Sequence, residues 1–161
     1  MSKSLNRVRA ALSAAGIETE IRELSDGTRT AEAAAAAVGC AIDQIAKSII
    51  FHDEAADGIV LFVTAGGKRV DPARARAVAG VPLSRADPAT VRRLTGFAIG
   101  GVAPLGHLST PRAFFDPHLM TFDTVWAAAG TPHHVFSVNP ARLATEIGAQ
   151  VSDFTAISNK M

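Results

Sequence analysis

The chain has 161 residues, of which 48% are hydrophobic and 19% are charged, and its formal net charge is +1. A chain of this length buries roughly 70% of its unfolded surface in one core, so we expect a single domain over residues 1–161. The composition excludes a disordered protein, and no apolar run approaches the roughly 20 residues of a membrane helix. The first residues lack a signal-peptide pattern, which predicts a cytoplasmic protein.

Apolar residues at helical spacing predict a first helix that starts after Ser4, its N-cap, and stops at Gly16. Polar and apolar residues then alternate over 17–22, which predicts a half-buried strand. The sequence Ser-Asp-Gly at 25–27 predicts a turn after it.

Thr30 precedes an alanine-rich segment that runs to Gly39, which predicts a second helix with these residues as its caps. Asp43 is expected to cap a further helix of one or two turns. The apolar runs 49–51 and 59–63 flank a short polar segment, so they predict a hairpin in the middle of a sheet.

Three Asx-Pro pairs predict helix starts, because the first residue can cap the helix and proline fits its first position. They are Asp71-Pro72, Asp87-Pro88 and Asn139-Pro140, and Gly80, Gly96 and Gly148 are the expected stops. Apolar segments follow the three helices at 81–83, 97–99 and 151–154.

The runs 124–129 and 135–138 predict a second hairpin, which brings the total to seven or eight short strands. Hairpins and crossover helices are both expected, so a doubly wound parallel sheet is disfavoured. We predict an α+β fold: a mixed, curled, barrel-like sheet with surrounding helices.

A cluster of turn-forming residues follows the apolar segment 97–99 and predicts a binding loop. It contains Gly100, Gly101, Pro104 and Gly106, and it ends at His107. Glycines let a ligand approach the backbone, and free amide groups can hold a carbonyl or phosphate oxygen. An ordinary connection between two elements is the alternative interpretation.

Lys47 stands where a polar segment meets the apolar strand that follows it. A lysine at the start of a strand can reach into a pocket. It can equally be a solvated charge near a helix end, where the helix dipole favours a cation.

The segment 68–93 is basic, with seven lysines and arginines and two aspartates, a local charge of +5. Such a bias suits a polyanionic partner, although solvated helix faces would give the same pattern. The candidate contacts to a polyanion are Lys68, Arg69, Arg74 and Arg76.

Common catalytic motifs are absent: there is no phosphate-binding loop, no His-Glu-x-x-His pair, no Gly-x-Ser-x-Gly elbow and no second cysteine beside Cys40. Adjacent His133 and His134 would point to opposite faces of a strand and could not hold one ion. We therefore expect neither a metal nor a cofactor.

Lys47 within the segment 45–51, followed by Gly100-x-x-x-Pro104-x-Gly106, resembles the YbaK/ProX superfamily of aminoacyl-tRNA deacylases. These proteins are similar to the editing domain of bacterial prolyl-tRNA synthetases. Segments 114–117 and 126–132 add to the resemblance, which spans residues from about 10 to 154.

The resemblance implies hydrolysis of the ester that joins a wrong amino acid to tRNA, with serine, threonine or alanine favoured. It implies catalytic roles for Lys47, Gly100 and Gly106, with the ribose hydroxyl and a water sharing the chemistry. Substrate-binding roles follow for Thr30, Gly101, Pro104, His107, Gly130 and His134.

The expected partners are misacylated tRNA and a synthetase or elongation factor, and the expected state is a monomer or weak homodimer. Two alternatives remain from the sequence. One is a module that binds a tRNA end or a synthetase without turnover. The other is a small-molecule amide or ester hydrolase, which would normally need a nucleophile with an orienting acid.

Overall fold

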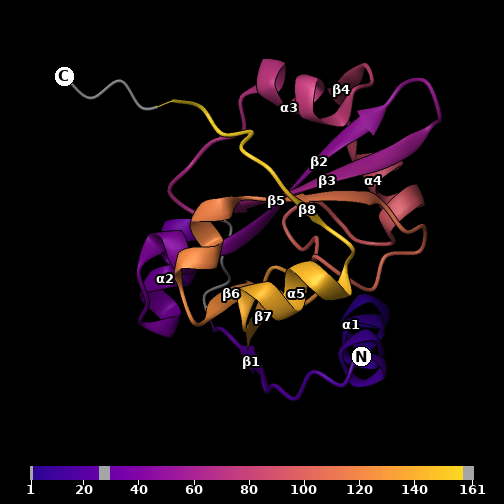
Figure 1. The fold of residues 1–161 in the computed structure, drawn as a ribbon. Helices are drawn as coiled ribbons and strands as arrows, with labels where there is room; N and C mark the ends of the chain where they lie inside the picture. Colours follow the sequence, from indigo (N-terminus) through magenta and orange to yellow (C-terminus); the bar gives the residue numbers. More distant parts are fainter. Residues whose placement is uncertain (1, 26–29, 158–161) are drawn as a thin grey trace.

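Two β-sheets organise the fold of the computed structural model, which describes residues 2–25 and 30–157 (Figure 1). A five-stranded sheet has the order β4-β2-β3-β5-β8, and a three-stranded sheet has the order β1-β7-β6. The strands of the larger sheet are β2 (Ala46–Asp53), β3 (Gly58–Ala65), β4 (Leu83–Arg85), β5 (Arg112–Phe115) and β8 (Gln150–Val151). Those of the smaller sheet are β1 (Ile21–Glu23), β6 (Val125–Ala128) and β7 (His134–Val138).

The predicted hairpins are both present. Strands β2 and β3 pair antiparallel from Ala46↔Ala65 to Asp53↔Gly58, and β6 pairs with β7. Strand β3 is buried along almost its whole length, as expected for an apolar run at the centre of a sheet.

Four of the helices begin where their caps predict. Thr30, Asp71, Asp87 and Asn139 each accept a backbone N–H of the first turn, and Gly39, Gly80 and Gly96 end three of the helices in left-handed geometry. The α-helices are α1 (Lys3–Ala14), α2 (Ala31–Val38), α3 (Pro72–Ala79), α4 (Pro88–Thr95) and α5 (Pro140–Glu146). Two 3-10 helices are η1 (Ile42–Gln44) and η2 (Pro117–Thr121).

The expected barrel-like curl is wrong, because the strands form two separate sheets. Over residues 2–25 and 30–157, backbone pairing between the two sheets is reduced to one isolated parallel bridge, Ile45↔Trp126. Beyond that bridge β6 continues alongside β7 and not along β2, so the ladder never closes.

Several local expectations are corrected. Ser2, and not Ser4, caps α1, and Ser4 Oγ instead donates to Gly130 O at 2.7 Å. Of the strand expected over 17–22, only residues 21 and 22 are in a strand, as part of β1. Asp43 lies inside η1 and does not cap it, and the turn expected at 25–27 falls mostly outside the described residues.

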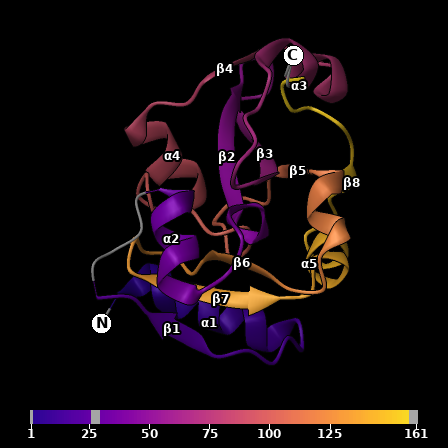
Figure 2. The same cartoon turned by 90° about the vertical axis from the view of Figure 1, so that its left-hand side faces the viewer.

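The core has two main parts, one on each face of the large sheet. Phe62, Phe114 and Phe154 pack together on the face that α3 covers, and Leu61, Val63 and Phe115 pack on the other face with α1 and the smaller sheet. Figure 2 shows α3 and α1 at opposite ends of the molecule with β2 and β3 running between them. Among the described residues, no helix is long and apolar enough to cross a membrane.

Candidate active site

A cavity of about 500 Å³ opens where the two sheets part. This volume lies in the range of small-molecule sites. The cavity is lined by α2, β2, the end of β4, α4, the loop after α4 and both strands of the smaller hairpin. Its lining includes Thr30, Lys47, Ser48, Ile49, Ile50, Arg85, Ala86, Val91, Ile99, Gly100, Val102, Trp126, Ala127 and Ala128.

One wall of the cavity is an unpaired strand edge. In the described part of the chain, strand β4 pairs with β2 only at residues 51–53, and β6 meets this edge only at Ile45. Glu54 N donates to Pro82 O, so the even-numbered residues of β2 turn their backbone groups away from β3. Ser48 therefore presents its N–H and C=O groups toward the cavity, and Ile50 presents its N–H, because the C=O of Ile50 is used in the pairing with β4 next to Phe51↔Arg85.

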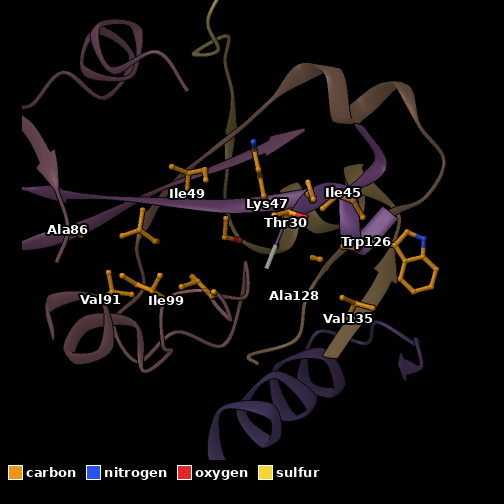
Figure 3. Close-up of a pocket in the computed structure, with 18 of the residues that line it drawn as sticks. Thr30, Ile45, Lys47, Ile49, Ala86, Val91, Ile99, Trp126, Ala128 and Val135 are labelled. Atoms are coloured by element: carbon orange, nitrogen blue, oxygen red, sulfur yellow. The ribbon is translucent and has the colours of Figure 1, made fainter. Parts of the chain in front are cut away.

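The cavity wraps around this edge, with different chemistry on its two sides. Lys47 and Ile49 project from one side of β2, while Val91 and Ile99 lie on the other side (Figure 3). Ile50 packs with the second group, in a cluster that contains Val91. A ligand in the cavity would therefore meet a cation on one side of the strand and apolar side chains on the other.

Lys47 is half-buried, and its Nζ donates to the carbonyl oxygen of Gly66 at 3.3 Å. Burial lowers the pKa of this ammonium, and the charge of Arg69 lowers it further, against the opposing effect of Asp43 and Asp116. An ammonium has three protons, so one long hydrogen bond leaves it able to donate to a ligand.

Gly100 is exposed at the other side of the cavity and has φ +94°. A Cβ at Gly100 would meet only Pro132 Cγ at 3.9 Å, so the backbone angle and not crowding requires glycine there. Ile99 beside it is 57% exposed, which is unusual for isoleucine and leaves apolar surface at the cavity. Thr30 lines the same cavity from the start of α2, and its Oγ1 accepts a hydrogen bond from the Ala33 N–H.

The structure separates the second half of the predicted loop from this cavity. Pro104, Gly106 and His107 line a different hollow of about 330 Å³, between α1 and the end of α5. Gly106 has φ +81° and lies against the backbone of Arg7. Gly100 and Gly106 are thus brought to different hollows.

His107 is directed into the protein. Its Nε2 lies 2.6 Å from Ala103 O, its Nδ1 is buried without a hydrogen-bond partner, and its ring meets the edge of Phe97. Burial lowers the pKa of this imidazole below its ordinary 6.5, so the neutral ring with a proton on Nε2 fits the contact to the carbonyl.

The other proposed substrate-binding residues also lie outside the cavity lining. Gly101 and Gly130 are buried where another part of the backbone lies close. A Cβ at Gly101 would lie 2.8 Å from Thr131 Cα, and a Cβ at Gly130 would lie 2.7 Å from Ser4 O. His134 starts β7, and its Nδ1 lies 2.7 Å from Thr131 Oγ1. These contacts hold the loop, the β6–β7 turn and α1 together.

The four proposed tRNA-binding side chains are outside the lining too. Arg74 pairs with Asp153 at 3.0 Å and donates to Thr155 O at 2.7 Å. Arg69 is close enough to Lys47 to lower its pKa. Lys68 is half-buried and Arg76 is exposed.

Sequence reasoning missed several residues of the cavity, above all Arg85, Ile99 and Trp126. Arg22 lies over the ring of Trp126 at 4.8 Å. The only tryptophan of the chain was a usable signal, because large aromatic side chains are common in ligand sites. Arg85 belongs to the basic segment 68–93 and Ile99 to the apolar segment 97–99, but no local pattern singled either of them out as a cavity residue.

The cavity lining offers no nucleophile with an adjacent base. Among its described residues there is no carboxylate, imidazole or thiol, and its two side-chain hydroxyls belong to Thr30 and Ser48. The Ser48 Oγ is buried without a partner, and the Thr30 Oγ1 caps α2. In the described part of the chain, no three side chains of His, Cys, Asp or Glu gather as metal ligands. The arrangement suits hydrogen bonding and charge stabilisation of a bound ester.

Comparison with known proteins shows which family the chain resembles. Residues 25–145 match the family model described as the aminoacyl-tRNA editing domain. YwhH of Bacillus subtilis (strain 168), an uncharacterized protein, is 32% identical over 140 residues, which cover 87% of this chain and 88% of YwhH.

Solved structures agree with this match. One described as "a putative trans-editing enzyme for prolyl tRNA synthetase" is 43% identical, covers 97% of this chain and 99% of its own, and superposes with a TM-score of 0.90. The hypothetical protein APE2540 is 28% identical, with coverages of 93% and 99% and a TM-score of 0.85.

Proposed function

The chain belongs to the aminoacyl-tRNA editing domain family, and on that premise we propose that it is a trans-acting deacylase of misacylated tRNA. The reaction is hydrolysis of the ester between a wrong amino acid and the terminal adenosine. It breaks the bond between the acyl carbon and the ribose oxygen, and it adds one water to give free amino acid and free tRNA.

The observation that carries this proposal is the meeting of Lys47 and Gly100 at one cavity. An aminoacyl ester is already activated, so its hydrolysis needs a positioned water and stabilisation of the charge that develops on the carbonyl oxygen. Lys47 supplies a cation, and the open edge at Ser48 and Ile50 supplies backbone N–H groups. The free vicinal hydroxyl of the ribose and the water complete the chemistry, so no acyl-enzyme is formed.

The cavity walls support a small amino acid as the substrate. Alanines occupy much of the lining, at positions 31, 34, 46, 86, 127 and 128, and they form an apolar surface with few hydrogen-bonding side chains. A hydrophobic pocket discriminates poorly against a side chain that only adds a hydroxyl. Alanine, serine and threonine therefore remain the proposed substrates together.

The basic segment supports tRNA as the partner, with Lys68, Arg69 and Arg76 as the proposed phosphate contacts outside the cavity. Arg74 is the weakest of the four candidates, because its guanidinium already pairs with Asp153. A synthetase or elongation factor would then supply further tRNA selectivity, in the cytoplasm where tRNAs are charged.

The test is incubation of the purified protein with tRNAs that carry labelled alanine, serine, threonine or a large cognate amino acid. Catalytic loss of label from a small amino acid, at substoichiometric protein, supports the deacylase. Tight binding without loss would identify a binding module instead. Loss of all amino acids at similar rates would contradict the proposed selection of small side chains.

A further inference from the structure

Arg85 is the second cation of the cavity, and the proposed ester hydrolysis leaves it without a role. It is the last residue of β4 and lines the cavity together with Lys47. Its side chain is exposed, and the described part of the chain provides it with no ion pair or side-chain hydrogen bond. Arg74, Arg93 and Arg112, by contrast, are each held by a carboxylate or a carbonyl.

The register of the sheet places Arg85 on the same face as Lys47. Arg85 lies directly opposite Phe51 in the antiparallel pair of β2 and β4, and directly opposite residues share a face. Phe51, Ile49 and Lys47 alternate along β2 and share that face as well. The two cations are therefore separated by about 13 Å along the strand, with the apolar Ile49 between them.

We propose that Arg85 binds the phosphodiester that joins the terminal adenosine of the tRNA to the preceding nucleotide. The inference rests on the proposed deacylase function and names a contact within the same site. A nucleoside lying over Ile49 has its ester-bearing ribose toward Lys47 and its 5′ phosphate toward Arg85. Guanidinium groups match phosphate oxygens with paired hydrogen bonds, which suits this position better than a lysine would.

The alternative, that Arg85 is only a solvated surface charge, predicts no dependence on the phosphate. Two substrates that differ only in that group separate the two cases. One is adenosine esterified with the amino acid identified by the tRNA panel, and the other is the corresponding ester of adenosine 5′-monophosphate. Full-length misacylated tRNA is the third substrate.

The variant is Arg85→Gln, and Arg9→Gln is the matched control, because Arg9 is exposed on α1 and lies outside the cavity lining. We expect Arg85→Gln to lower kcat/KM about 10- to 100-fold for the tRNA and for the monophosphate ester, mainly through KM. Its kcat/KM for the adenosine ester should equal that of the wild type. The slope of log affinity for tRNA against log salt concentration should also become shallower, by somewhat less than one, the change expected when one phosphate contact is lost.

Binding of uncharged adenosine 5′-monophosphate and adenosine, measured by titration, tests the contact without any turnover. The wild type should bind the monophosphate more tightly, and Arg85→Gln should abolish that preference. Equal binding of both ligands by the wild type, or an unchanged preference in Arg85→Gln, would overturn the assignment of Arg85. A wild type that binds the monophosphate more tightly than adenosine but hydrolyses no ester would contradict the deacylase proposal and still support the phosphate contact of Arg85.

Discussion

Arg7 Nη2 donates a hydrogen bond of 2.6 Å to the carbonyl oxygen of Gly96. The same guanidinium donates from Nε to Gly106 O at 3.2 Å and lies over the ring of Phe97 at 4.9 Å. One side chain of α1 thus fixes both ends of the segment that carries Gly100. The position of the glycine loop depends on a contact that is about ninety residues away in the sequence.

Replacing Arg7 by methionine should destabilise the protein by about 2 to 4 kcal/mol. Two hydrogen bonds from a charged donor and one cation–π contact are lost, and two carbonyls lose a partner. Urea denaturation monitored by circular dichroism measures the change. Arg9→Met, two positions along α1 at an exposed site, should stay within about 0.5 kcal/mol of the wild type. Equal effects of both substitutions would show that Arg7 does not anchor the loop.

His107 should make the protein less stable in acid. Its folded-state pKa lies below 6.5, so between that folded value and 6.5 the unfolded chain binds a proton that the folded chain does not. Stability therefore falls as pH decreases below about 6.5, by at most about 1.4 kcal/mol per pH unit from this residue.

Urea midpoints from pH 7.5 to pH 5 measure this dependence, and His107→Gln is the variant that should flatten it. Glutamine can keep a donor for Ala103 O without titrating. If the variant keeps the full slope of the wild type over that range, then another group is responsible for the acid sensitivity.

The structure explains which parts of the sequence could be interpreted. The helix starts at Asp71, Asp87 and Asn139 are local events, decided by one capping side chain and the proline after it, so a short motif suffices to predict them. Strand β5 had no such local signal. Its four residues become a strand because they pair parallel with β3, which lies about fifty residues earlier.

The residues of the candidate site also fall into two groups, those that a local motif predicts and those that depend on distant contacts. Lys47 was identified because its surroundings in the sequence are distinctive, and the structure places it at the cavity. Gly106 and His107 share the loop motif, but Arg7 and Phe97 hold them under α1, a contact that the sequence does not reveal. Arg85 and Ile99 reach the cavity only because two separate sheets part beside β2.

Enlarging Ala128 should shrink the cavity and change which amino acids are accepted. Ala128 is half-buried on β6 and lines the cavity. We expect Ala128→Leu to lower kcat/KM at least tenfold, and threonine should be lost before alanine because it is larger. Competition between threonyl- and alanyl-tRNA measures the shift.

Ala36→Leu on the exposed face of α2 adds the same volume outside the lining and is the control. An Ala128→Leu enzyme with unchanged selectivity would mean that the aminoacyl group binds elsewhere.

Lys47→Ala under single-turnover conditions, with the misacylated tRNA that the wild type hydrolyses fastest, tests the central claim most directly. Loss of one group that stabilises developing charge typically costs about 100- to 1000-fold in rate, and we expect a loss of that size with thermal unfolding close to that of the wild type. A Lys47→Ala protein that is folded and deacylates at the wild-type rate would contradict the account.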